Sequence, residues 1–135
     1  MKKCISLWLI ALVLISTSCE KEAEPYYVLT IVAHVVDTEG NPIQGIYAYP
    51  EGGSFLGREG YSNYKGEIGA FAHLKPRREW IVIFEDVDGD YNGGIFESVR
   101  VDISDRVLPA STPDEWGYAG SCSVVLGDVV MSRIE

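Results

Sequence analysis

The chain has 135 residues, 47% of them hydrophobic, and a formal net charge of −9. This length suits one domain built around one core rather than two domains. The acidic charge is repelled by phosphate backbones, which argues against nucleic acid as a partner, and it is repelled by anionic headgroups as well. Any attachment to a membrane would therefore have to come from a lipid and not from a basic patch.

The first residues have the features of an export signal. Lys2 and Lys3 give a positive start, the apolar stretch 5–15 is too short to span a bilayer, and small residues follow at 16–18. These small residues lead directly into Cys19, which resembles the lipobox of bacterial lipoproteins, although the position three residues earlier is Ser rather than Leu. The resemblance implies cleavage before Cys19 and a lipid on this residue. Ordinary secretory cleavage with a soluble product is the alternative.

We expect residues 1–18 to be the signal, 19–25 to be the acylated Cys and a tether, and 26–135 to be the domain. Without the two lysines of the signal, nine basic and twenty acidic residues give a formal charge of −11. The polar segment "EKEAEP", which ends in Pro, is typical of a linker. Its acidic start also resembles the surface-export signal of Bacteroidetes lipoproteins. This resemblance implies a surface-exposed lipoprotein of the outer membrane.

The chain after residue 25 is predicted to form strands joined by turns. Segment 27–37 alternates, which predicts a half-buried strand with His34 on its outer face. The core face of this strand is expected to carry Leu29, Ile31, Ala33 and Val35. The Gly and Asn-Pro of 38–42 predict a turn, and extended chain follows up to Pro50. Segment 61–74 predicts two short strands around a turn at 64–66.

The second half of the chain continues this pattern. Segment 79–86 is largely apolar on both faces, which predicts a central strand covered on both sides. Segment 97–103 alternates and is predicted to point Val99, Val101 and Ile103 inward. A long irregular segment with two prolines follows, and 122–135 supplies the last strand or two, in which the lone Cys122 is expected to be a small buried residue. About seven short strands predict an all-β fold, an antiparallel β-sandwich.

Two turns resemble those of carboxypeptidase-regulatory-like modules. In "VVDTEGNPIQGIYAY" a strand ends in Asp, turns through Gly-x-Pro and returns through an apolar residue and Gly. "YSNYKGEIGAF" stands where these modules have a Thr-Asp-x-x-Gly-x-Phe turn, and the corresponding positions are Ser62, Asn63, Gly66 and Ile68. The resemblance implies a single prealbumin-like Greek-key β-sandwich over 26–135.

The string "FEDVDGDYNGGIF", together with the leader and Trp116-Gly117, resembles the radical SAM-associated lipoproteins of Bacteroidetes. This family is named for genes near a radical SAM enzyme, and the resemblance implies no defined activity. The chain has no Cys-x3-Cys-x2-Cys cluster to hold an iron–sulfur centre. One alternative for its function is therefore that it is the substrate of a neighbouring radical SAM maturase.

The same string also raises the question of a metal. Residues two apart in an extended segment project to the same side, so three aspartates and an asparagine would converge, with oxygen ligands that suit calcium. The candidate ligands are Asp86, Asp88, Asp90 and Asn92. An EF-hand is excluded because Tyr91 stands where the sharp turn needs Gly. The favoured interpretation is a plain turn, in which the three glycines of the loop supply positive φ.

We predict no catalytic residues. The mature part has only His34 and His73 as histidines and no Gly-x-Ser-x-Gly motif, and both are expected to be surface or structural residues. Exposed rings on loops can bind sugars or peptides, and Trp116 and Tyr118 are the candidate ligand contacts. The basic cluster 75–79 is expected to be a solvated turn. The predicted function is a lipid-anchored, non-catalytic binding or accessory module for an envelope protein or glycan; a calcium-stabilised adhesion or glycan-binding domain is an alternative.

Overall fold

The computed structural model describes residues 23–53 and 60–134, so that Cys19 lies outside the described residues. The described residues form strands and no helix, which confirms the all-β prediction. The strands are β1 (Tyr26–Val36), β2 (Ile46–Pro50), β3 (Glu67–Leu74), β4 (Ile81–Asp86), β5 (Ile95–Phe96), β6 (Val99–Asp102), β7 (Tyr118–Val130) and β8 (Arg133–Ile134).

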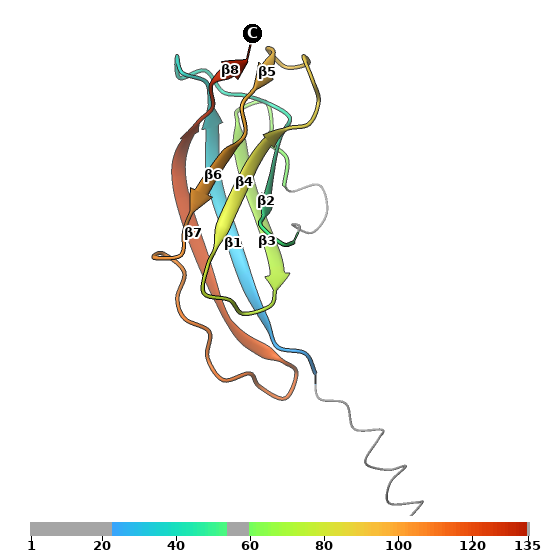
Figure 1. The fold of residues 1–135 in the computed structure, drawn as a ribbon, viewed down its shortest axis with the longest axis vertical. Coiled ribbons are helices and arrows are strands. Elements are labelled where there is room, and N and C mark those ends of the chain that lie inside the picture. The colour runs from blue at the N-terminus through green and yellow to red at the C-terminus, as the bar shows by residue number, and fades with distance from the viewer. Residues whose placement is uncertain (1–22, 54–59, 135) are drawn as a thin grey trace, which may run out of the picture.

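Two three-stranded sheets form the body of the domain, one with the order β3-β1-β7 and one with the order β2-β4-β6. Figure 1 shows the two sheets as separate layers, with the short pair β5-β8 at the end of the molecule that holds the C-terminus. Buried side chains of both sheets make one core between the layers. Its largest members are Tyr27, Phe84, Leu29, Ile31, Ile46, Ile68, Ile103 and Met131. This arrangement is compatible with a β-sandwich.

The predicted faces of β1 are confirmed, since its four inward residues are at most 4% exposed and His34 points outward. Among the strands that the structure describes, all pairs are antiparallel except one: β1 runs parallel to β7 over nearly its whole length. The antiparallel prediction did not include this pair. The first and last long strands of a chain are not joined by a hairpin, so no short connection fixes their relative direction.

Strand β4 is central in its sheet, as predicted, but it is not covered on both sides. Val82 and Phe84 are fully buried, whereas Ile81 and Ile83 are half-buried and point outward. The outward pair lies opposite Asp102 and Arg100 of β6. In the described part of the chain no helix packs over this face, so the sheet is solvated on its outer side. The unbroken apolar run of β4 therefore did not indicate burial on both faces.

Only one of the two strands predicted within 61–74 forms. Residues 67–74 are β3, whereas Tyr61 makes a single bridge to Tyr47. The turn begins too early for a second strand, because the side-chain oxygen of Asn63 accepts hydrogen bonds from the amides of Lys65 (2.9 Å) and Glu67 (2.9 Å).

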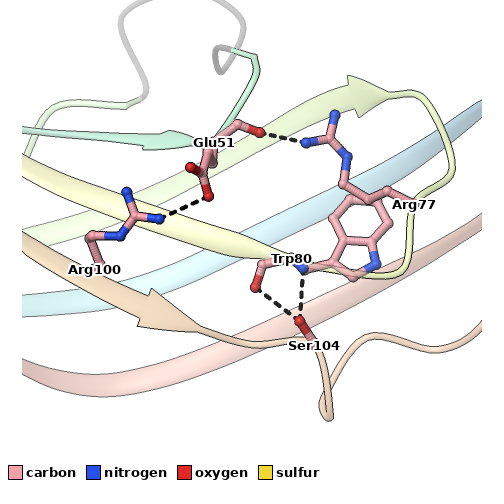
Figure 2. A network of polar contacts seen from close by, with 5 residues as sticks. All are labelled: Glu51, Arg77, Trp80, Arg100 and Ser104. Atoms are coloured by element: carbon pink, nitrogen blue, oxygen red, sulfur yellow. Dashed lines mark hydrogen bonds and ion pairs between the residues drawn. The ribbon is translucent and has the colours of Figure 1, made fainter.

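A network of polar contacts joins Glu51, which follows β2, to β6 and to the loop β3–β4 (Figure 2). The Glu51 carboxylate accepts a hydrogen bond from Arg100 (3.0 Å), and the Glu51 carbonyl accepts one from Arg77. The guanidinium of Arg77 also lies over the ring of Trp80, with 5.5 Å to its centroid. The backbone amide of Trp80 donates to the hydroxyl of Ser104 (2.8 Å). The exposed residues of the basic cluster 75–79 form a solvated turn, as predicted. Arg77 differs from them, because it makes structural contacts with Glu51 and Trp80.

Candidate binding surface

Four rings lie across the outer face of the sheet β3-β1-β7. Tyr118 of β7 meets Tyr26 of β1 edge to face, with 5.9 Å between centroids, and Tyr26 stacks on His73 of β3 at 5.1 Å. His73 in turn lies 6.1 Å from Phe71. We call these four residues the aromatic strip. It connects all three strands of the sheet.

The register between the strands explains why these four rings lie side by side. Tyr26 is opposite Tyr118 in the parallel pair, while Val28 is opposite His73 and Thr30 is opposite Phe71 in the antiparallel pair. Since side chains alternate along a strand, residues 71 and 73 share the outer face with residue 26. Phe71 and Tyr118, the two ends of the strip, are each 38% exposed.

Small hydroxyl side chains accompany the strip. Ser121 and Ser123 are exposed on β7, and Ser123 lies opposite Thr30. The hydroxyl of Tyr118 donates to the Ser121 hydroxyl at 3.1 Å. Neither the strip nor these hydroxyl residues include Asp, Glu, Lys or Arg. This part of a strongly acidic molecule thus presents rings and hydroxyl groups without fixed charge.

A hollow of about 570 Å³ continues the same face beyond the strip. Its lining includes Val32, Val125 and the two glycines Gly69 and Gly127, at neither of which an added Cβ would meet another atom within 4 Å. The register of β1 with β7 shifts between Val32 and Ala33, as at a β-bulge. The hollow therefore results from the two glycines, which have no side chain to fill it, and from the shift in register.

His34 lines the hollow, and the shifted register places it opposite Asp128. The Nδ1 atom of His34 is 2.8 Å from a carboxylate oxygen of Asp128. The hydrogen bond to Asp128 and a second to the backbone of Lys65 raise the pKa of His34 above its ordinary value. Both contacts favour the protonated ring, which is a poor general base. A His beside a carboxylate is a common catalytic arrangement. Here the pair links β1 to β7, and its protonated form is favoured.

The two ligand contacts predicted from sequence fall in different places. Tyr118 belongs to the aromatic strip, whereas Trp116 lies outside it, on a tight turn just before β7. Its side chain is 74% exposed. Sequence reasoning missed Tyr26, Phe71 and His73 as members of one surface. The alternation of β3 pairs Phe71 with His73, but only strand register adds Tyr26.

The Asp-rich loop forms a turn after β4. Gly89, Gly93 and Gly94 have positive φ, as predicted, and Asn92 joins them with φ 58°. The carboxylate of Asp86 accepts hydrogen bonds from the amides of Phe96 (3.1 Å) and Asp88 (3.3 Å), so it closes the turn. These contacts account for Asp86 without an ion.

The four predicted calcium ligands are only partly brought together. Asn92 donates to the Asp88 carboxylate (2.6 Å), and burial, followed by the hydrogen bond with Asp88, raises the pKa of Asp86. Asp90 is exposed. Within residues 23–53 and 60–134, no three His, Cys, Asp or Glu side chains form a group that could hold a metal ion. Calcium binding at this loop stays an untested alternative, and a plain turn stays the favoured interpretation.

A second group of rings lies on the opposite sheet. Tyr47 packs against Tyr61 at 4.8 Å and stacks on Tyr49 at 5.3 Å. The Tyr49 hydroxyl donates to Glu85 at 2.9 Å, and this bond raises the pKa of Tyr49. These three rings pack on one another, and one of them is hydrogen-bonded to the Glu85 carboxylate. This group therefore differs from the aromatic strip, which includes no carboxylate.

Comparison with models of known protein families gives no match to the chain, and neither does comparison with curated proteins. The resemblance to the radical SAM-associated lipoproteins therefore stays a prediction. Over the part of the chain that the structure describes, no helix has the length and apolar character needed to cross a membrane.

Proposed function

We propose that this chain is a non-catalytic binding module of the cell envelope, anchored through a lipid on Cys19, and that it binds an uncharged glycan on the aromatic strip. The observation that carries the proposal is the line of four rings across three strands, next to exposed hydroxyl groups. The anchor rests on the signal-like residues 1–18 that lead into Cys19.

The chemistry of the strip suits a sugar chain. Rings provide rigid apolar contact area with polar edges, and hydroxyl groups exchange hydrogen bonds with sugar hydroxyls. The mature chain has a formal charge of −11, which disfavours acidic polymers, and the strip itself has no side chain of Asp, Glu, Lys or Arg to recognise an ionic group. A neutral polysaccharide is therefore the favoured ligand class.

We also propose that the domain is a Greek-key sandwich of the carboxypeptidase-regulatory-like kind. Support comes from the turn residues that carried the resemblance. The hydroxyl of Ser62 accepts a hydrogen bond from the Ile46 amide (2.9 Å) and donates to the Ile43 carbonyl (2.7 Å). Gly66 has φ 76° and Ile68 is buried. These residues tie the first turn of the chain to the second.

Affinity electrophoresis tests the glycan proposal. The lipid-free domain or the detergent-solubilised chain is run through gels that contain a neutral polysaccharide such as a β-glucan, a xylan or a mannan. We expect retardation by one of them, and loss of retardation in Phe71→Ala and Tyr118→Ala. The matched control is Tyr91→Ala, because Tyr91 is 74% exposed but lies on the loop after β4. Equal mobility of all four proteins in every gel would contradict the proposal.

A further inference from the structure

One end of the molecule is built around the start of the domain. The amide of Tyr26 donates to the carbonyl of Gly117 at 2.7 Å, and a Cβ on Gly117 would collide with the carbonyl oxygen of Glu24. Glu24 and Pro25 also line a hollow with Lys75 and Pro76. We call residues 23–25, 75–79 and 108–117 the N-terminal end. In Figure 1 the loops β3–β4 and β6–β7 both lie at the end where β1 begins.

Trp116 is held outward at this end by an organised turn. A carboxylate oxygen of Asp114 accepts hydrogen bonds from the amides of Trp116 (2.8 Å) and Tyr118 (3.0 Å), and the Gly117 amide donates to the Asp114 carbonyl (3.0 Å). The turn is therefore fixed while the indole is 74% exposed. Leu108 of the same loop is 64% exposed. Two large apolar side chains thus project from the end that carries the tether.

Charge is distributed unequally between the two ends. The N-terminal end has three basic and four acidic residues, so its charge is nearly balanced. The opposite end, made of residues 37–41, 86–97 and 131–134, has six acidic residues and a single basic one, Arg133. An anionic surface therefore repels the opposite end more strongly than the N-terminal end. The net charge of the whole chain conceals this difference.

We propose that the N-terminal end docks on the headgroup layer of the membrane that holds the lipid anchor, with Trp116 and Leu108 inserted at the interface. This inference rests on the proposed anchor at Cys19. Six residues lie between Cys19 and Tyr26, so the two are seven residue steps apart, and a fully extended segment of that length spans at most about 25 Å. The docking end is thus kept within reach of the bilayer at all times.

The chemistry of this end fits a zwitterionic phospholipid. Trp is enriched at the membrane interface because its ring is apolar and its N–H is polar, and Lys and Arg side chains reach from apolar surroundings to headgroup phosphates. Lys75 and Arg78 are the exposed cations in the β3–β4 loop. When this end rests on the membrane, the strands point away from the bilayer, and the aromatic strip, whose Tyr26 and Tyr118 adjoin this end, faces sideways.

Fluorescence of the lipidated chain in phosphatidylcholine vesicles tests the docking. Trp8 leaves with the signal and Trp80 is only 5% exposed, so Trp116 is the accessible tryptophan of the mature protein. We expect its emission to shift to the blue on reconstitution and to be quenched by lipids brominated near the headgroup. In Trp116→Phe the quenching is lost, while the remaining Trp80 emission shows that the fold is intact.

A second variant tests the orientation. Tyr91→Trp in the Trp116→Phe background places an equally exposed ring at the opposite end, and brominated lipid should leave its emission unchanged. Unquenched Trp116 in protein that floats with the vesicles overturns the docking and leaves the anchor standing. Protein that does not float overturns the anchor, and the docking with it. A shift of Trp116 emission on addition of a soluble neutral polysaccharide, without quenching by lipid, assigns this residue to the glycan instead and also overturns the docking.

Discussion

The replacement of Ser62 by Ala is expected to destabilise the domain strongly. Ser62 is 4% exposed, and its hydroxyl serves both the Ile46 amide and the Ile43 carbonyl. Removal of the hydroxyl leaves these two buried backbone groups without their side-chain hydrogen-bond partner. A buried polar group that loses its hydrogen bond costs about 1–3 kcal/mol. We therefore expect the free energy of unfolding to fall by about 2–4 kcal/mol, out of a total of about 5–15 kcal/mol for a domain of this size.

Urea denaturation measures this loss. The buried Trp80 reports unfolding, and the denaturant dependence should keep its slope while the midpoint falls, since the core is unchanged. The matched control is Ser123→Ala, because Ser123 is exposed on the outer face of β7, and its effect is expected to stay within about 0.5 kcal/mol. A loss below about 1 kcal/mol for Ser62→Ala would refute the assignment of this hydroxyl as the link between the two turns.

Further predictions address other parts of the structure. Gly66→Ala should destabilise by about 1–3 kcal/mol, because φ is 76° and a Cβ would collide with the Val35 carbonyl oxygen; Gly69→Ala, at ordinary φ with open space, should be neutral, and equal effects in urea melts would contradict this. Burial, followed by interactions with Cys122, raises the pKa of Tyr27 to about 12, so its contribution to stability is complete below about pH 10 and is lost as the pH rises from there through 12; thermal melts of Tyr27→Phe should lack this part of the alkaline loss. Millimolar calcium should leave the melting temperature unchanged, because Asp86 already accepts two backbone hydrogen bonds and Asp90 is exposed; a rise that Asp88→Asn abolishes would establish the calcium site. The intact mass of the native protein should equal that of the chain cleaved before Cys19 and lipidated, and additional mass would support modification by a maturase.

Alternation along the chain predicted much of the fold. The inward residues of β1 and β6 are those that the period of two selects, and the turn at Asn63 to Gly66 follows from residues that favour turns. Long-range pairing could not be predicted in this way. Nothing local distinguishes a parallel β7 from an antiparallel one, and the apolar run of β4 does not reveal that Ile81 and Ile83 face outward.

The candidate site depends on that missing information. Tyr118 was selected from sequence because it follows a proline-containing loop, and it does lie on the strip. Tyr26 and His73 join it only because β1 lies between β3 and β7 in a particular register. Trp116, selected beside Tyr118, is separated from the strip by the turn that Asp114 organises. Residues adjacent in sequence thus serve different surfaces, whereas residues far apart form one.

Nuclear magnetic resonance titration with the neutral polysaccharide that retards the protein tests the glycan surface most directly. The account predicts shifts in the ring and amide signals of Tyr26, Phe71, His73 and Tyr118, and unchanged signals from Tyr47, Tyr49 and Tyr61 on the opposite sheet. Shifts confined to the tyrosines of the opposite sheet, or no shifts at saturating polysaccharide, would contradict it.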